Sequence, residues 1–211
     1  MIEHFSGSQH MAMRRYYRWH AIIYNVTRWT FLLGRNRLLD RLPIVDTKEQ
    51  TLLEVGCGTG RNLLRLASKH RRLRLLGVDV SSDMLARASR PSRKYKRRIQ
   101  LYERPYPTDA LDMKRPADFI LFSYALSMFN PGWEEAISSA YEDLPAGGRI
   151  AVVDFHDTPN TLFKQWMSKN HVRMEAHLIP LLQSKFKTEH LELRPVFGGL
   201  WRCCLFIGVK E

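Results

Sequence analysis

Residues 52–62 of this 211-residue chain read LLEVGCGTGRN. A short apolar run, typical of a buried strand, ends in Glu54 and is followed by three glycines within five residues. Glycine adopts positive φ angles and lets a ligand come close to the backbone. A helix starting after Gly60 would offer N–H groups without intrahelical partners in its first turn. The stretch therefore predicts a strand, a tight turn and a helix start that hold a nucleotide-like ligand.

The spacing of these glycines is G-x-G-x-G, whereas dinucleotide-binding proteins use G-x-G-x-x-G. Glu54, two residues ahead of the first glycine, would repel a pyrophosphate and suits a cationic amino-acid group instead. A second carboxylate, Asp79, ends another apolar run 19 residues after Gly60. There it can bind the two ribose hydroxyls of an adenosine. A simple glycine turn in an α/β protein would explain the first feature but not both together.

These residues resemble motif I of the class I S-adenosylmethionine-dependent methyltransferases, in which the acidic residue and the glycine loop hold the methionyl part of the cofactor. The resemblance implies S-adenosyl-L-methionine as the cofactor and S-adenosyl-L-homocysteine as the product. The cofactor-binding residues that we expect on this basis are Glu54, Gly56, Cys57, Gly58, Gly60, Asn62, Asp79, Val80, Met84 and Ser123.

Composition is that of a single globular domain, with 45% hydrophobic and 26% charged residues. No apolar run approaches the roughly 20 residues that a membrane span needs. The polar residues 1–13 are expected to be a flexible arm. The three cysteines show neither a disulfide framework nor a zinc spacing, so we expect no metal and a reducing cytoplasm.

The net charge of +12 points to an anionic partner, either a membrane surface or nucleic acid, or simply to solvated basic faces. Thirteen basic residues and only two acidic ones lie between Arg61 and Arg98. The helices expected there should therefore present a basic sector on one side of the molecule, with a basic stretch at residues 87–98.

Residues 14–42 are basic, amphipathic and rich in tyrosine and tryptophan. Apolar residues recur at three- and four-residue steps from Tyr16 to Phe31, which is a helical period. Gly34 is expected to end this helix, and residues 36–42 to form a second short one. Such a segment can lie in a membrane interface or cover an active site as a lid.

The rest of the chain predicts a Rossmann-like α/β fold with seven strands, the last two forming an antiparallel hairpin. The core is expected at residues 51–211, which with the helical lid at 14–42 makes one methyltransferase domain over 14–211. The segment from His171 to about Lys185 is expected to cover the substrate. The predicted strands are 51–55, 73–79, 99–102, 117–124, 149–155, 191–196 and 201–209.

Open α/β sheets bind ligands at the carboxyl ends of their parallel strands. His156 follows the fifth predicted strand and is therefore expected at this edge, as a base, a substrate contact or a solvated histidine. After the third strand, neither Glu103 nor Asp109 falls clearly where related enzymes contact adenine, and Tyr106 is an alternative that could stack there.

Several segments together are similar to bacterial betaine-lipid N-methyltransferases, which convert diacylglyceryl-homoserine to its trimethyl betaine. They are the aromatic stretch from Tyr16 to Arg35, the glycine loop, the SYALSM run at 123–128 and the VDF run at 153–155. Family members often carry Asp at position 25 and Gly at position 156, where this chain has Asn25 and His156. The resemblance implies a lipid amine as acceptor, at an anionic membrane surface.

Methyl transfer to an amine mainly requires alignment and stabilisation of a developing cation. Tyrosine ring faces attract methylated ammonium groups, so Tyr16, Tyr24 and Tyr124 are the expected cage, and His156 or a tyrosine could accept the amine proton. Arg28 or Arg173 would pair with a carboxylate or phosphate. The residues expected to contact substrate are Arg28, Ser127 and Arg173.

Two other substrates stay open: phosphatidylethanolamine, and RNA with the basic surface as its footprint. Against RNA, the chain lacks the Asn/Asp-Pro-Pro-Tyr/Phe tetrapeptide of base-amine methylation after the fourth strand. A binding module without catalysis is disfavoured because Glu54, the glycines and Asp79 are all present. We expect a cytoplasmic protein on the inner face of the membrane, and the sequence leaves its oligomeric state open.

Overall fold

Seven extended runs of the chain pair into one sheet with the strand order β3-β2-β1-β4-β5-β7-β6. The computed structural model describes residues 33–107 and 116–211. Neighbours are parallel from β3 to β5, whereas β7 is antiparallel to β5 and β6. The strands are β1 Gln50–Val55, β2 Leu73–Asp79, β3 Ile99–Glu103, β4 Phe119–Ser123, β5 Arg149–Asp157, β6 Lys187–Val196 and β7 Trp201–Val209.

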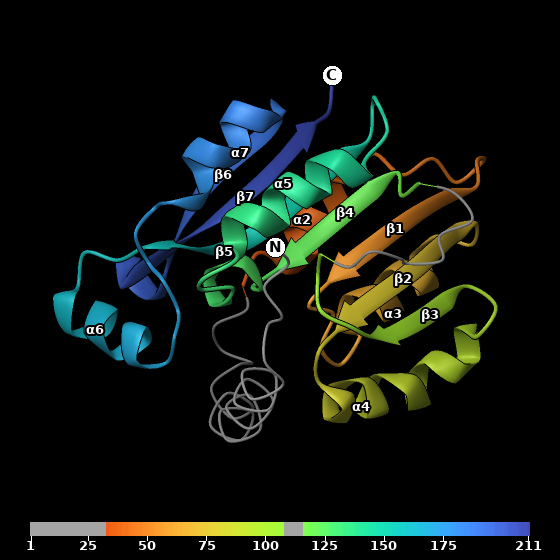
Figure 1. Cartoon of the computed structure of the whole chain (residues 1–211), viewed down its shortest axis with the longest axis horizontal. Helices are drawn as coiled ribbons and strands as arrows, with labels where there is room; N and C mark the ends of the chain where they lie inside the picture. Colours follow the sequence, from red (N-terminus) through yellow and green to blue (C-terminus); the bar gives the residue numbers. More distant parts are fainter. Residues whose placement is uncertain (1–32, 108–115) are drawn as a thin grey trace, which may run out of the picture. The chain divides into compact units, whose positions relative to one another are not determined.

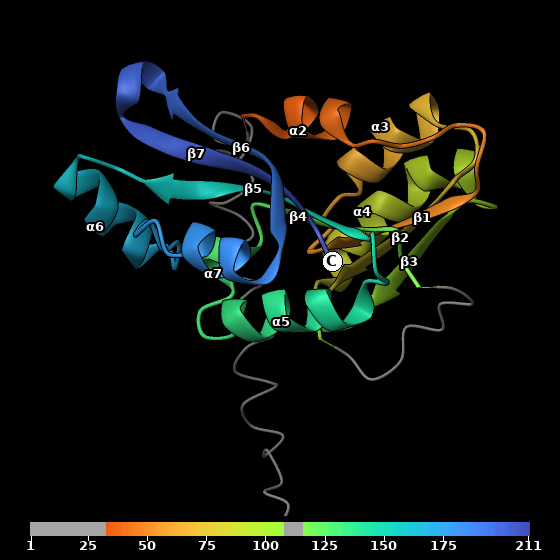
Figure 2. The same cartoon turned by 90° about the horizontal axis from the view of Figure 1, so that it is seen from above.

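Helices cover both faces of this sheet (Figures 1 and 2). One face carries α2, α3 and α4, and the other carries α5 and α7, while α6 lies beyond the carboxyl end of β5. The central strands are apolar because they are covered on both sides. The helices are α2 Arg35–Arg41, α3 Arg61–Lys69, α4 Ser82–Ser92, α5 Trp133–Asp143, α6 Thr161–Lys169 and α7 Leu178–Lys185, with short 3₁₀ turns η1 Arg93–Tyr95, η2 Leu126–Met128 and η3 Phe197–Gly199.

The sheet confirms the predicted Rossmann-like class with seven strands and an antiparallel end. Ser81 caps α4, because its side chain accepts a hydrogen bond from the Met84 amide at 3.4 Å. Residues 178–185, expected only as part of a substrate cover, form α7 instead. Pro180 is its third residue, and proline is tolerated in the first turn of a helix.

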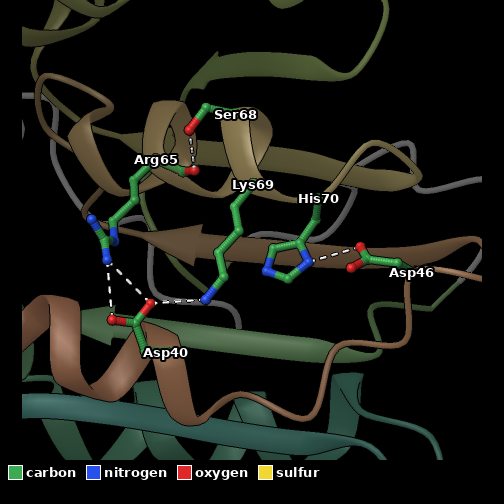
Figure 3. A network of polar contacts seen from close by, with 6 residues as sticks. All are labelled: Asp40, Asp46, Arg65, Ser68, Lys69 and His70. Atoms are coloured by element: carbon green, nitrogen blue, oxygen red, sulfur yellow. Dashed lines mark hydrogen bonds and ion pairs between the residues drawn. The ribbon is translucent and has the colours of Figure 1, made fainter.

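The short helix α2 packs firmly on the domain. Leu38 and Leu39 are buried against it, and Asp40 bonds Arg65 and Lys69 of α3, each at 3.0 Å (Figure 3). Hydrogen bonding from Lys69 lowers the pKa of the Asp40 carboxyl. The second helix of the expected lid is thus part of the layer on this face of the sheet, and the remaining lid residues, 14–32, lie outside the described residues.

The basic sector gathers at one end of α4. Basic residues at 93, 94, 96 and 97 are exposed, and this stretch leads into the amino end of β3. It therefore lies at the edge of the sheet opposite the carboxyl ends of the parallel strands (Figure 1). Within the described ranges, no helix combines the length and apolarity that crossing a bilayer requires.

Candidate active site

The loop between β1 and α3 depends on its glycines. Gly56, Gly58 and Gly60 have φ angles of 69°, 53° and 69°, which L side chains rarely adopt. A Cβ on Gly56 would lie 2.9 Å from the Cβ of Ala125, and one on Gly60 would lie 3.2 Å from the Cβ of Ala88. Larger residues would therefore strain the loop and fill the space beside it. Glycine avoids both effects and keeps the loop backbone accessible to a ligand.

Glu54 and Asn62 form the buried polar base of this loop. Both are almost fully buried, and the Asn62 amide donates to Glu54 Oε1 at 2.7 Å. The bond fixes a carboxylate at the carboxyl end of β1, next to the start of α3. A buried carboxylate held in this way fits the ammonium group of a methionyl tail. Cys57 lies between them in sequence, and its amide donates to the Val78 carbonyl at 3.0 Å.

Asp79, at the end of β2, organises the neighbouring turn. Its two carboxylate oxygens accept hydrogen bonds from the Gly58 amide at 2.7 Å and the Ser81 amide at 2.9 Å. A carboxylate oxygen can accept more than one hydrogen bond, so a carboxylate at this position suits a ribose diol while it ties two loops together. Val80 beside it is 43% exposed and offers an apolar surface, and Met84 lies in the first turn of α4.

The adenine side is only partly defined. Glu103 pairs in register with Asp79 at the end of the adjacent strand, so the two carboxylates end neighbouring strands at the same edge of the sheet. The stacking of Tyr106 on adenine stays a prediction. Its ring packs against Phe122 at 6.0 Å, and its hydroxyl donates to Asp143 at 2.8 Å. Asp109 lies outside the described residues.

The end of β4 adjoins the cofactor loop. Ser123 pairs in register with Val153, and its Oγ is buried with no hydrogen-bond partner among the described residues. Such an atom fits a polar group of a bound ligand. The chain passes Gly56 between β4 and η2. A side chain at position 56 would meet Ala125, which lies directly before η2.

Tyr124 does not offer the ring face that a cation cage would need. It adopts a left-handed φ of 55°, and only 3% of it is exposed. Its hydroxyl donates to the Leu33 carbonyl at 2.6 Å, while Phe155 and Trp201 pack edge-on against its ring. Burial raises its pKa. In the described structure Tyr124 stabilises the domain interior. Tyr16, Tyr24 and Arg28 lie outside the described residues.

A buried carboxylate holds η2 in place. Asp154 is fully buried and accepts hydrogen bonds from the amides of Ser127 at 3.2 Å and Phe155 at 2.8 Å. Burial raises its pKa to about 6. Ser127 itself is buried, and its carbonyl accepts a hydrogen bond from the Arg173 amide at 3.1 Å. Two of the three residues expected to bind substrate, Ser127 and Arg173, are therefore brought together by the backbone.

The Arg173 side chain lies near an aromatic ring and a carboxylate. Its guanidinium is 6.0 Å from the centre of the Trp133 ring, at the start of α5, and its Nε donates to Glu175 at 2.8 Å. Its side chain is 37% exposed, so a substrate anion can still reach it.

Two histidines complete this part of the site. His156 is 8% exposed, and its carbonyl accepts a hydrogen bond from the Ala176 amide at 2.8 Å, which places His177 beside it. The His177 ring meets Trp133 edge-on at 4.7 Å. Burial lowers the pKa of His156, and burial together with Arg173 lowers that of His177 to about 4. His177 could not be identified from the sequence, because no motif marks it.

Comparisons with known proteins support S-adenosylmethionine as the cofactor. Residues 53–150 match the sequence profile of a methyltransferase domain family. A 51-residue stretch is 35% identical to the malonyl-[acyl-carrier protein] O-methyltransferase of Methylovorus sp. (strain MP688). The match covers 24% of this chain and 17% of that enzyme.

Solved structures share the fold at low sequence identity. The 1,6-didemethyltoxoflavin-N1-methyltransferase of Burkholderia thailandensis, solved with S-adenosylhomocysteine, is 15% identical with a TM-score of 0.73, and the match covers 100% of this chain and 93% of that one. The N-methyltransferase NodS of Bradyrhizobium japonicum is 20% identical with a TM-score of 0.63, and the match covers 84% of this chain and 96% of that one. The methyltransferase SibL is 19% identical with a TM-score of 0.63. The match covers 85% of this chain but only 55% of SibL.

The strand order and the solved structures show the fold of the class I methyltransferases, the class that depends on S-adenosylmethionine, and residues 53–150 match a methyltransferase domain family. The cofactor expected from Glu54, the loop and Asp79 is thereby supported.

Proposed function

We propose that the protein transfers methyl groups from S-adenosylmethionine to the headgroup amine of a membrane glycerolipid, with diacylglyceryl-homoserine, converted to its trimethyl betaine, as the favoured substrate. One observation carries this proposal: the cofactor loop and the polar residues near Ser127 meet through residues 123–127. Gly56 adjoins Ala125, and Ser127 is bonded to both Asp154 and Arg173. A methyl donor on the loop would thus lie one short turn away from an acceptor.

The residues divide the work between cofactor and acceptor. Bound S-adenosylmethionine would supply an activated methyl group on its sulfonium. Glu54 would bind its ammonium group and Asp79 its ribose hydroxyls. Alignment of the two reactants accounts for much of the acceleration in such displacements. The homoserine headgroup carries an amine and a carboxylate on one carbon, and the carboxylate would pair with Arg173.

A lipid substrate requires contact with a membrane, and α6 supports this part of the proposal. Leu162 and Trp166 lie four residues apart on one side of this helix and are 75% and 42% exposed. Residues 158–174 contain three basic residues and no acidic one. Exposed apolar and aromatic side chains beside basic ones favour an anionic interface. The tyrosine cage and lid of residues 14–32 remain part of the proposal, as does a location on the inner face of the membrane.

Mass spectrometry of lipids from cells that express the chain tests the proposed substrate. New mono-, di- and trimethylated homoserine lipids are expected in a host that supplies diacylglyceryl-homoserine. Cells that express Asp79→Ala should lack them. Methylated ethanolamine lipids instead would move the substrate to phosphatidylethanolamine, and methylated RNA without lipid products would reject the lipid class.

A second candidate is O-methylation of a carboxylate. It is favoured by the short match to the malonyl-[acyl-carrier protein] O-methyltransferase and by the guanidinium of Arg173 at the acceptor side. A carboxylate acceptor releases no proton when it is methylated, whereas the ammonium formed from an amine must lose a proton before it can accept another methyl group. Supplying purified protein with both a malonyl thioester and a lipid amine separates the two reactions by their products.

A further inference from the structure

Three ring nitrogens at the acceptor side are buried and unsatisfied. They are Nδ1 of His156 and both nitrogens of His177, and none of them has a hydrogen-bond partner among the described residues. A neutral imidazole has one donor and one acceptor nitrogen. Leaving such groups buried without partners is costly, so the cluster calls for a ligand that both donates and accepts hydrogen bonds.

We propose that His156 and His177 bind the acceptor amine, accepting its two N–H hydrogen bonds so that the nitrogen lone pair faces the methyl group of the cofactor. The inference rests on the proposed function and assigns the part of the site that holds the amine. A primary amine has two N–H groups and one lone pair, which matches two acceptor nitrogens and one reaction direction. The second nitrogen of His177 is left to donate to an oxygen of the headgroup.

The surroundings keep both rings in the neutral form that can accept hydrogen bonds. The charged groups that act on His177 are Arg173, Glu175 and His156, and those that act on His156 are Asp157 and Arg202. Glu175 is paired with Arg173 at 2.8 Å, and Asp157 is paired with Arg202. Because both carboxylates are paired with arginines, they do little to stabilise an imidazolium. Burial then keeps the rings neutral near pH 7.

The methyl transfer step needs no strong base from the protein. The amine lone pair forms the N–C bond while the C–S bond breaks, and the sulfonium takes that electron pair and becomes a thioether. The methylated ammonium then gives its proton to water before the next transfer. Each methyl group replaces one N–H, so the histidines make two hydrogen bonds to the primary amine, one to the monomethyl amine and none to the dimethyl amine.

This dependence on methylation state gives a test that a merely structural role would not pass. Purified full-length chain is supplied with diacylglyceryl-homoserine and, separately, with its monomethyl and dimethyl forms. For His177→Phe we expect kcat/KM to fall about tenfold with the primary amine, less with the monomethyl amine and not at all with the dimethyl amine. His177→Gln, which keeps an acceptor oxygen, should recover part of the loss.

Two controls make the result decisive. His190→Gln removes a ring on β6 that bonds Arg41 at 3.1 Å and should leave all three steps unchanged. Calorimetric binding of S-adenosylhomocysteine should be the same in every variant. Equal losses at all three steps, or no loss at the first, would overturn the assignment of the histidines. Absence of transfer to any lipid amine by the unaltered protein would instead reject the proposed function.

Discussion

The cofactor side and the acceptor side of this edge satisfy their polar groups in opposite ways. On the cofactor side, Glu54 is bonded by Asn62, and Asp79 by two loop amides. Glu54 and Asn62 are eight residues apart in sequence, and Asp79 is 21 residues from Gly58 and two from Ser81. On the acceptor side, three imidazole nitrogens find no partner among the described residues. The first half is therefore largely preorganised by the protein itself, although Ser123 Oγ beside it also lacks a partner among the described residues, whereas we propose that a ligand completes the second.

The largest effect is expected at Asp79. Asp79→Ala removes both the acceptor for the ribose hydroxyls and the bonds to the Gly58 and Ser81 amides. Affinity for S-adenosylhomocysteine, measured by calorimetry, should fall about a hundredfold. Asp83→Ala, in the exposed first turn of α4, is the matched control and should bind normally. Unchanged affinity in Asp79→Ala would reject the ribose assignment, and tight binding of NAD by the unaltered protein would reject the cofactor.

A pair of glycines separates backbone strain from steric contact in the cofactor loop. Gly56→Ala and Gly147→Ala both place a side chain at positive φ, 69° and 78°, but only the first Cβ meets another atom, at 2.9 Å. Both should lose roughly 1 kcal/mol of stability from strain. Cofactor affinity should fall about tenfold for Gly56→Ala alone, since a kilocalorie or more of local distortion corresponds to that factor. Equal affinity in the two variants would mean that the loop does not approach the cofactor.

The acceptor side should show itself in the pH dependence of stability. The pKa of His177 is about 4 in the folded chain against 6.5 ordinarily, so between these values only the unfolded chain binds the proton. The free energy of unfolding should therefore fall as pH drops through this window. Asp154, whose folded pKa is raised to about 6 from 3.8, has the opposite effect there.

The contribution of His177 is isolated by substitution. His177→Phe should remove about 1–2 kcal/mol of the stability lost between pH 7 and pH 4, a value reduced for the partial exposure of the ring. Urea unfolding at several pH values measures the difference between the two proteins. Parallel pH curves for wild type and variant would show that His177 titrates normally.

The smallest effect concerns the basic sector, which is distant from both halves of the site. Arg97→Gln should weaken binding to anionic vesicles several-fold at low salt, since a basic residue near the surface contributes about 1 kcal/mol. The difference should vanish at high salt because of screening. Leu162→Ser on α6 should weaken vesicle binding at both salt concentrations, with Val45→Ser as a control for loss of an exposed apolar side chain. Binding of RNA but not of vesicles would favour the RNA alternative.

The cofactor half could be predicted from the sequence because its residues lie near one another in the chain. Glu54, the three glycines and Asp79 belong to one β-α-β unit, and the loop geometry follows from local rules on φ and helix starts. The strand pattern likewise predicted all seven strands, with β6 starting four residues earlier than expected.

The acceptor half could not be predicted in this way because long-range contacts build it. The hydrogen bond from the Ala176 amide to the His156 carbonyl brings His177 next to His156. Ala176 has a left-handed φ of 56°, and alanine at this position does not indicate such a conformation. The inward turn of Tyr124 follows from its own left-handed φ and its bond to the Leu33 carbonyl. Neither could be inferred from spacing or composition.

The most direct test of the central claim is methyl transfer by purified protein. The full-length chain is incubated with S-adenosylmethionine carrying a labelled methyl group and with diacylglyceryl-homoserine in detergent, and the lipids are analysed by mass spectrometry. We predict successive mono-, di- and trimethylated products from the unaltered protein and none from Asp79→Ala. Recovery of the lipid without label, from a protein that binds S-adenosylhomocysteine normally, would contradict the account of the acceptor.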